Sequence, residues 1–415
     1  MSSHPERSGN TPGLRILALA NAHALAHVSR LLEIAKVLRA RGHEVVFAGH
    51  GKYLPVAAAD GFATRELPYI PVERVVRAVR SQRLWELYQE DELEGFIAAE
   101  RALYDALVPD CVLIDNRPSA RTSAELAGIP SVAVLNVHMS NYRVLPFFSW
   151  VQAAGGRGWL EPLDRWQNAL ECRLYDRLVM GGMNRLRRRL GLKPLYAYEH
   201  EEGQLALLAD LPEFNPARAL PPHVRYIGPL TWHNALPPPH CLERLDPARP
   251  VAYFSLGSEG LAELVQALGA LTDEGVQVVV AAGAAEAERL QPPPGVWLER
   301  FVNTERLLPQ CDLVVCHGGN GTLYQALAHG LPCVVVATHA EQHYGGKRIV
   351  QLGLGRATTL PRLRRRGLRW LTDNVRVLLS DPAYRQRALA FRARFAGWEG
   401  AQAGAEAVEV LARRH

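Results

Sequence analysis

The chain has 415 residues, of which 48% are hydrophobic and 21% are charged. These proportions are ordinary for a globular protein and exclude a disordered, collagen-like or coiled-coil chain, while the length predicts two to three domains. The net charge of +5 is too small an excess to indicate nucleic-acid binding by itself. No apolar run reaches the ~20 residues of a membrane-spanning helix, and the polar segment Met1–Pro12 lacks the apolar core of a signal peptide.

The first half of the chain predicts a doubly wound parallel sheet. The apolar run Leu14–Ala20 is typical of a buried parallel strand, and a helical apolar stripe over residues 31–38 follows it. The segment Glu44–Ala48 predicts the next strand and completes a βαβ unit. The same alternation continues in three further predicted strands and one helix: Cys111–Ile114, Ser131–Leu135, Leu205–Ala209 and Ala120–Ala127.

Prolines separate this half from a second one with the same alternation. They crowd between residues 221 and 250, which excludes a helix or a central strand and predicts a stiff linker. After the linker we predict four strands and two helices: Val251–Leu256, Val276–Ala282, Leu313–Cys316, Cys333–Val336, Gly260–Thr272 and Thr322–Ala328. We therefore expect an α/β protein with two doubly wound, Rossmann-like domains. The expected boundaries are residues 1–230, a linker at 231–250, a second domain at 251–395 and a final helix at 396–415.

The cysteines and two arginine-rich runs bear on the cellular setting. None of the six cysteines forms a CxxC motif, so we interpret them as buried, reduced thiols of a cytoplasmic protein rather than metal ligands. The runs Arg185–Arg189 and Arg362–Arg366 are interpreted as solvated helix faces. The alternative is that they attract an anionic membrane surface, which would place the protein at the inner face of the membrane.

One loop concentrates residues that bind phosphate. The run His317-Gly-Gly-Asn-Gly-Thr322 directly follows a predicted strand and directly precedes a helix, and ligands of open parallel sheets bind beyond such strand ends. Glycines let backbone N–H groups approach an anion, and the helix N-terminus adds its positive dipole end. The spacing is neither GxGxxG nor that of a P-loop. We predict a pyrophosphate cradle, the alternative being a glycine-rich turn without a ligand.

The longer segment His317–Pro332, followed by Glu341-Gln342, resembles the donor-binding signature of GT-B glycosyltransferases. More narrowly, it resembles the family of plant and bacterial nucleotide-sugar transferases that glycosylate natural products. Further matching segments are Phe254–Ser258, Tyr226–Leu230, Leu308–Asp312, Ala26-His27 and Arg41–Val45. The resemblance implies two domains facing a central cleft, with the acceptor bound by the first domain and the nucleotide sugar by the second. It also implies that the final helical segments, Asp373–Arg394 and Ala403–Arg413, cross back onto the first domain.

The resemblance implies a donor site in the second domain. Its phosphate contacts would come from His317, Gly319, Asn320, Gly321 and Thr322. Its other members would be Phe301 and Val302 beside the base, Glu341 and Gln342 at the sugar hydroxyls, and a small-residue loop formed by Ser255, Gly257 and Ser258. For Phe301 the alternative is core packing. Gln325 stands where the family has a glutamate that grips the ribose, and an amide is the weaker acceptor, so the ribose contact is left open.

Catalysis of sugar transfer needs a base for the acceptor hydroxyl, and histidine is suited to this near neutral pH. His27 falls on the family's catalytic histidine position, although Ala26 replaces the usual glycine and Ser29-Arg30 replaces the usual Asn-Pro. His23 is the alternative base. Asp115 ends a neighbouring predicted strand, so we expect it to meet and orient His27. The alternative is that Asp115 caps the helix that follows it.

Together these residues predict an inverting, metal-independent glycosyltransferase. It would use a UDP or dTDP sugar as co-substrate and no other cofactor. The aromatic and apolar segment Val144–Trp166 indicates a hydrophobic small-molecule or lipid acceptor. The cluster of His339, Glu341 and His343 resembles a metal site, but the implied reaction needs no metal. The alternatives are a non-catalytic auxiliary protein and a nucleotide-sugar epimerase or hydrolase of the same architecture. No nucleic-acid partner is expected, and no sequence feature indicates an oligomeric state.

Overall fold

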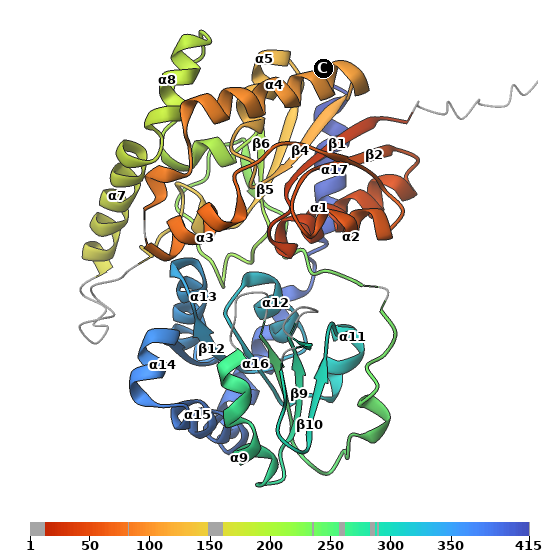
Figure 1. The fold of residues 1–415 in the computed structure, drawn as a ribbon, viewed down its shortest axis with the longest axis vertical. Coiled ribbons are helices and arrows are strands. Elements are labelled where there is room, and N and C mark those ends of the chain that lie inside the picture. Colours follow the sequence, from red (N-terminus) through yellow and green to blue (C-terminus); the bar gives the residue numbers. More distant parts are fainter. Residues whose placement is uncertain are drawn as a thin grey trace, which may run out of the picture.

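The computed structural model describes residues 13–81, 83–147, 161–234, 236–256, 262–282, 287–288 and 290–414. It contains two parallel sheets, each in its own α/β body (Figure 1). The first sheet has the order β3-β2-β1-β4-β5-β6-β7, with every neighbouring pair parallel. Its strands are β1 Arg15–Asn21, β2 Glu44–His50, β3 Ala63–Glu66, β4 Cys111–Asp115, β5 Ser131–Leu135, β6 Leu205–Leu208 and β7 Val224–Tyr226.

Helices cover both faces of the first sheet, which explains why its central strands are continuously apolar. Along β1, Ile16 and Ala18 face the core that contains α1, while Leu17 and Leu19 face the core beneath α4 and α5. The helices of this body are α1 Leu25–Ala40, α2 Leu54–Ala59, α3 Val72–Ser81, α4 Glu90–Leu107, α5 Ala120–Ala127, α7 Glu161–Leu178 and α8 Gly181–Arg189.

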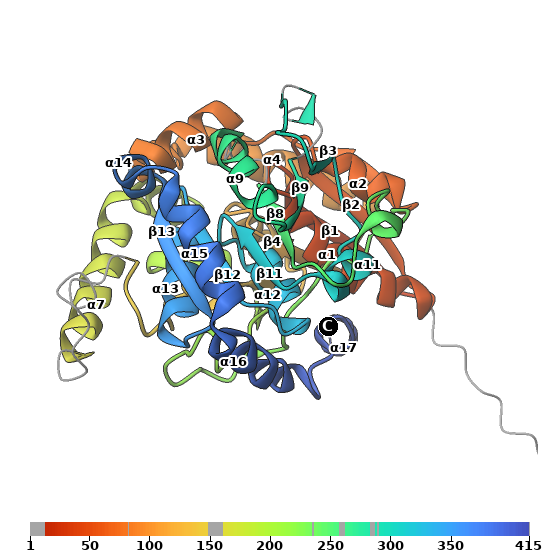
Figure 2. The same cartoon turned by 90° about the horizontal axis from the view of Figure 1, so that it is seen from below.

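The second sheet has the order β10-β9-β8-β11-β12-β13, again with parallel pairs throughout (Figure 2). Its strands are β8 Val251–Ser255, β9 Gln277–Ala281, β10 Val296–Glu299, β11 Leu313–Cys316, β12 Cys333–Ala337 and β13 Gly355–Thr359. The helices around it are α9 Gly269–Thr272, α11 Thr304–Leu307, α12 Asn320–Ala328, α13 Ala340–Gln351, α14 Leu360–Arg366, α15 Arg369–Ser380 and α16 Pro382–Arg392. The helix predicted over residues 260–272 is 3-10 at Ala262–Ala267 and α-helical only in α9.

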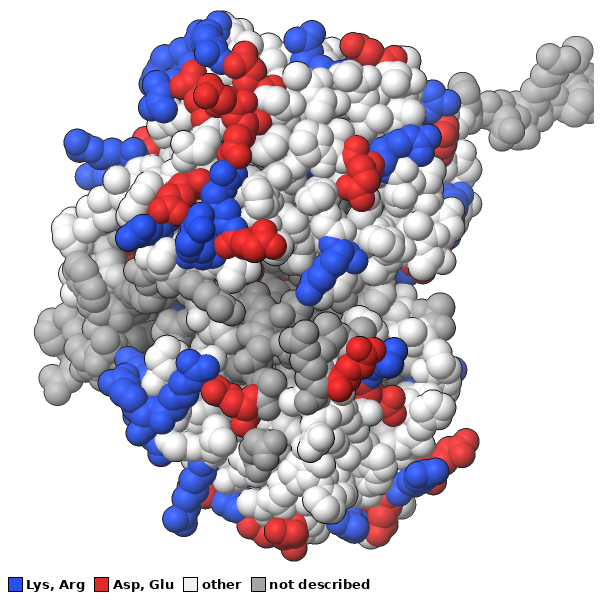
Figure 3. All heavy atoms as spheres, in the orientation of Figure 1, with Lys and Arg blue, Asp and Glu red and all other residues white. Residues whose placement is uncertain are grey.

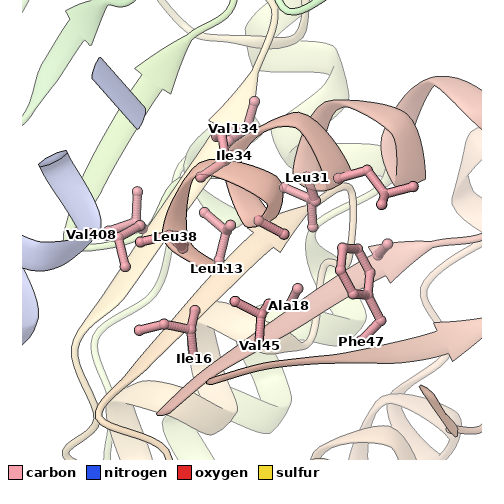
Figure 4. Packing of buried hydrophobic residues seen from close by; sticks show 14 of the residues in the cluster. Ile16, Ala18, Leu31, Ile34, Leu38, Val45, Phe47, Leu113, Val134 and Val408 are labelled. Carbon is pink, nitrogen blue, oxygen red and sulfur yellow. The ribbon is translucent and has the colours of Figure 1, made fainter. Parts of the chain in front are cut away.

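One helix returns to the first body. Helix α17 (Gly400–Ala412) packs on α1, and Val408 lies beside Leu38 in the first core (Figure 4). The approach is close, because a Cβ on Gly404 would lie 2.6 Å from Ile34. The expectation that residues 373–394 also cross back holds only at the end of this segment. Helices α15 and α16 bury Leu371, Val375 and other apolar residues in the cores of the second body, while Phe391 near the end of α16 packs against Phe214 of the first body.

Candidate active site

Polar residues follow four neighbouring strands of the first sheet, at the carboxyl edge where parallel sheets bind ligands. His27 lies in the first turn of α1, six residues after β1, and Asp115 is the last residue of β4. Asn136 directly follows β5, and Asp210 lies two residues beyond β6. Strands β1 and β4 are paired with Ala20 opposite Asp115, which brings Asp115 to the loop before α1.

His27 and Asp115 form a close pair. The Nδ1 atom of His27 lies 2.6 Å from Oδ1 of Asp115. Asp115 is buried, with 1% of its side chain exposed, whereas His27 keeps 21% exposed. An ionised carboxylate only accepts hydrogen bonds, so the shared proton belongs to Nδ1 and the lone pair is left on Nε2. Asp115 makes no capping bond to α5, whose N-cap residue is Ser119.

Arg30 binds the same carboxylate from the next turn of α1. Its Nε lies 2.8 Å from Oδ2 of Asp115, and its Nη2 lies 2.7 Å from Oδ1. Its Nη1 donates to Oδ1 of Asn136, and the amide of Asn136 donates to the backbone oxygen of Ala209. Asp115 therefore receives hydrogen bonds from an imidazole and from a two-pronged guanidinium at the same time.

His23 is less suited to the role of base. Its Nε2 lies 2.8 Å from the backbone oxygen of Ile70, and a carbonyl only accepts, so this nitrogen carries a proton. Burial lowers the pKa of His23, and the neighbouring His50 lowers it further, against the hydrogen bond to Ile70, which raises it. The ring also packs against His50 and Tyr69. Its surroundings thus hold His23 in place through contacts that His27 does not make.

The glycine-rich loop joins β11 to α12 in the second body. Gly318 has a φ of +96°, and a Cβ there would lie 2.7 Å from both Gln342 and Val335, so this position requires glycine. Gly319 is the N-cap of α12 and brings its backbone close to the His317 ring. No side chain caps α12, and its first turn has no acidic residue. The helix start therefore has the properties of an anion site.

This helix start meets the first body at Asp210. Oδ1 of Asp210 accepts from Nδ2 of Asn320 at 3.1 Å and from the hydroxyl of Tyr324 at 2.7 Å. Oδ2 accepts from the backbone N–H of Val137 at 2.6 Å. Burial raises the pKa of the Asp210 carboxyl, although the nearby His138 and these hydrogen bonds act in the opposite direction. Asp210 thus fixes α12 against the edge of the first sheet at which His27 and Asp115 lie.

A second link joins α13 to the same edge. Glu341 pairs with the buried Nε2 of His138 at 2.9 Å, and 45% of its side chain is exposed. Burial raises the pKa of the Glu341 carboxyl, but the imidazoles around it, led by His138, outweigh that effect and the net shift is downward. Gln342 is turned inward, where its Oε1 accepts from the backbone and hydroxyl of Thr338. Of the two residues expected at the sugar, Glu341 is the more accessible.

The remaining expected donor residues differ in exposure. Phe301 has 45% of its surface exposed, which argues against its alternative role in the core, whereas Val302 is buried in the second core. Gln325 donates to the backbone oxygen of Trp232 in the linker at 3.3 Å. Gly321 and Thr322 lie in the first turn of α12, and Ser255 ends β8. Gly257 and Ser258 lie outside the described residues.

Metal-ligand clusters, membrane-spanning helices and cysteines were each considered over the residues that the structure describes. The described ranges contain no group of three or more His, Cys, Asp or Glu side chains arranged to hold a metal ion. None of the helices that they include combines the length and apolarity needed to cross a bilayer. All six cysteines are free and buried, as predicted.

Comparison with known proteins identifies the family. Residues 262–402 match the family model described as "Erythromycin biosynthesis protein CIII-like, C-terminal domain". The chain is 32% identical over 400 residues to the PGL/p-HBAD biosynthesis glycosyltransferase of Mycobacterium tuberculosis (strain ATCC 25177 / H37Ra), with 92% of this chain and 90% of the relative covered. The chain is a GT-B glycosyltransferase. A second relative, the PGL/p-HBAD biosynthesis rhamnosyltransferase of Mycobacterium bovis (strain BCG / Pasteur 1173P2), is 32% identical over 390 residues, covering 91% and 84%.

Solved structures share the fold of this glycosyltransferase. Spinosyn rhamnosyltransferase SpnG complexed with spinosyn aglycone superposes with a TM-score of 0.70 at 18% identity, covering 95% of this chain and 100% of SpnG. SsfS6 of Streptomyces sp. SF2575, complexed with thymidine diphosphate, gives a TM-score of 0.69 at 19% identity, covering 96% and 99%.

The glycosyltransferase also has site residues that sequence reasoning missed. Arg30, Asn136 and Asp210 were not predicted as members of the site, whereas Gly318 belongs to the predicted phosphate loop. Arg30 was noted only as a departure from the family pattern, and Asp210 follows a predicted strand directly, which is the signal that would have found it. Asn136 carries the same signal after β5.

Proposed function

We propose that the protein is an inverting glycosyltransferase in which His27 is the general base. The observation that carries this proposal is the 2.6 Å pair of His27 with the buried Asp115, which leaves Nε2 of His27 available to take a proton. The phosphate loop of the second body is tied to the same strand ends through Asp210 and Asn320. Base and donor site are thus held by one hydrogen-bonded framework.

In the proposed reaction, an acceptor hydroxyl attacks the anomeric carbon of the donor sugar. The new bond joins the acceptor oxygen to the anomeric carbon, while the bond from that carbon to the diphosphate oxygen breaks. The hydroxyl proton passes to Nε2 of His27, and Asp115 stabilises the imidazolium that forms. The nucleoside diphosphate leaves with its charge balanced by the uncapped start of α12 and by His317. This mechanism uses no metal and no further cofactor.

The proposed donor is a nucleoside diphosphate sugar, with thymidine diphosphate as the favoured nucleotide. Solved relatives of the same fold are complexed with this nucleotide, and one curated relative is named a rhamnosyltransferase. Glu341 is proposed to bind sugar hydroxyls, because its carboxylate is ionised and partly exposed beside His138. Gln325 is proposed to contact the ribose, with Phe301 beside the base and Ser255 at the end of β8 also near the donor.

The proposed acceptor is an apolar molecule with a hydroxyl group, bound by the first body. Phe147 and the buried Tyr344 pack around His138, and of these two rings Phe147 is the one that is partly exposed. The relatives named above act in PGL/p-HBAD biosynthesis, and SpnG was solved with an aglycone. We place the reaction in the cytoplasm, where free thiols such as the six buried cysteines persist.

We further propose that α7 makes peripheral contact with an anionic membrane. Four of its apolar residues have from 37% to 57% of their surface exposed: Leu163, Trp166, Leu174 and Leu178. Three exposed arginines lie between them: Arg165, Arg173 and Arg177. Basic side chains also gather near α14, on the same side of the molecule (Figure 3). Such a mixture of arginine, tryptophan and leucine fits a lipid interface.

By contrast, the run at residues 185–189 is engaged within the protein. Arg185 and Arg189 pair with Glu90, and Arg187 is buried against Glu125. Sedimentation with vesicles of phosphatidylcholine alone or with 30% phosphatidylglycerol tests the α7 surface. We expect binding only to the anionic vesicles and its loss in R173E/R177E, with R185E as the matched control. Equal binding of both variants would contradict this role of α7.

The test of the reaction combines nucleotide binding with turnover. Calorimetry measures binding of dTDP and UDP, and nucleotide release is followed with dTDP-rhamnose and the phenol methyl 4-hydroxybenzoate in the presence of EDTA. We expect H27Q to bind dTDP normally but to lose 10²–10⁴-fold in kcat, H317Q to bind weakly, and the control H23Q to stay active. The product should have the opposite anomeric configuration to the donor. An active H27Q, or no binding of either nucleotide, would overturn the proposal.

A further inference from the structure

Arg30 is the charged residue closest to the proposed base that the mechanism does not use. It makes two charge-assisted contacts to Asp115, at 2.8 and 2.7 Å, and its Nη2 lies 3.2 Å from Nδ1 of His27. Only 11% of its side chain is exposed. Arg30 is therefore built into the interior of the site rather than available to the donor or to solvent.

The charges around this pair set what His27 can do. A buried carboxylate with one imidazole as its sole partner favours the protonated imidazolium, which is useless as a base. A guanidinium is always charged, so Arg30 supplies Asp115 with a permanent counter-ion. With Arg30 as its counter-ion, the Asp115 carboxylate does not need a second positive charge from a doubly protonated His27 ring. The cation beside Nδ1 also acts directly against the imidazolium.

The framework around Arg30 fixes its geometry. Its third nitrogen is held by Asn136, whose own amide is held by the backbone of Ala209. The guanidinium thus spans the ends of β4 and β5 from its place on α1. The other charged or titratable groups near the pair are Glu341 and Asp210, together with His138 and His339, whose charges act on Glu341. Burial lowers the pKa of Arg30, but Asp115 foremost, then Glu341 and Asp210, raise it overall.

We propose that Arg30 is a positioning residue, whose permanent charge against Asp115 and beside Nδ1 keeps His27 neutral with its lone pair on Nε2. The inference rests on the proposed function for its catalytic meaning, but its physical content, the charge state of His27, does not. The inference about the charge state of His27 does not depend on the phosphate loop or on where the acceptor binds. A neutral residue at this position would let Asp115 hold the imidazolium instead.

The direct test is the titration of the His27 ring in the full chain. Proton–carbon and proton–nitrogen spectra of histidine-labelled protein, assigned with H27Q, report its midpoint and its tautomer. We expect R30Q to raise the midpoint by about one pH unit, because a like charge next to the ring is lost. R30K keeps the charge but not the fork, so we expect its midpoint to stay close to that of the unchanged protein.

A double variant covers the case in which R30Q does not fold. Removing both charges in D115N/R30Q leaves no unpaired buried ion. The effect of Arg30 on the midpoint of the His27 titration is then the difference between D115N and D115N/R30Q. The midpoint should be higher in the double variant than in D115N. Unchanged midpoints in both comparisons would overturn the inference, whatever the stability of the variants.

Kinetics separate this inference from the proposed function. The acid limb of kcat against pH for methyl 4-hydroxybenzoate should move upward in R30Q by the same amount as the ring titration, with little change in the KM for the donor. A structural role alone would lower activity at every pH without moving the limb, and would contradict the inference. If H27Q is active, the assignment of the base fails; if H27Q is inactive but R30Q leaves titration and limb unchanged, only the inference fails.

Discussion

Replacing Asp115 with asparagine isolates the electrostatic part of the proposed mechanism. The amide is nearly isosteric with the carboxylate, so its oxygen can still face Nδ1 of His27 across the present 2.6 Å contact. The negative charge, however, disappears from a side chain that has only 1% of its surface exposed. Arg30 remains beside the ring, at 3.2 Å from Nδ1, and has then lost its counter-ion.

The expected loss follows from the charge that develops on His27. Two unit charges about 4 Å apart interact by about 4 kcal/mol at an effective dielectric constant of ~20. An imidazolium formed in the transition state loses this attraction in D115N, which corresponds to roughly a 10³-fold fall in kcat. The uncompensated Arg30 adds repulsion to that loss. Removing Arg30 as well should therefore recover part of the activity.

The assay is nucleotide release from dTDP-rhamnose, with calorimetric binding of dTDP measured in parallel. We expect D115N to bind dTDP as the unchanged enzyme does, because the phosphate loop belongs to the other body. The matched control is D105N, at an exposed position of α4. A loss of less than tenfold in kcat, in a variant that melts normally, would refute the reasoning. So would a D115N/R30Q enzyme that is slower than D115N.

The remaining predictions concern stability and nucleotide binding. Y324F removes one of the hydrogen bonds to Asp210 and leaves the backbone N–H of Leu211 without its buried partner, so it should cost about 3 kcal/mol in urea unfolding, with Y53F nearly neutral. An equal loss in both variants would contradict the bridging role of this hydroxyl. G318A forces a Cβ into a contact of 2.7 Å at φ +96°, so it should weaken dTDP binding at least tenfold in calorimetry, and unchanged binding would count against the loop. Burial raises the pKa of Cys111 to about 12, so its neutral thiol contributes stability that is complete below pH 9 and is lost as the pH rises toward 12. Between pH 9 and pH 11 the unfolding free energy should therefore fall by about 2 kcal/mol less in C111A than in the unchanged protein. The same fall in both proteins would show that this thiol is not responsible.

The sequence by itself determined the α/β class and most central strands. Buried parallel strands need unbroken apolar runs, and such runs at Cys111–Asp115 and Leu313–Cys316 are readable without any knowledge of their neighbours. The edge strands β3, β7, β10 and β13 were missed, because most of their residues are exposed or only partly buried and their pairing depends on the sheet beside them. The phosphate loop at residues 317–322 was likewise predictable from its own residues and from its place between a strand and a helix. Strand ends of one parallel sheet share an edge, which is why a meeting of His27 and Asp115 was predictable.

Only the tertiary structure decided which other groups complete the site. Arg30 is 85 positions from Asp115 along the chain, and nothing local distinguishes its buried guanidinium from the exposed arginines of α14. The contact of Asp210 with Asn320 and Tyr324 spans more than a hundred residues and joins two sheets whose relative placement no periodicity encodes. The same holds for α17, which returns to α1 from the far end of the chain. Charge pairing in the interior depends on which strand ends and helices meet, and that is a property of the packed molecule.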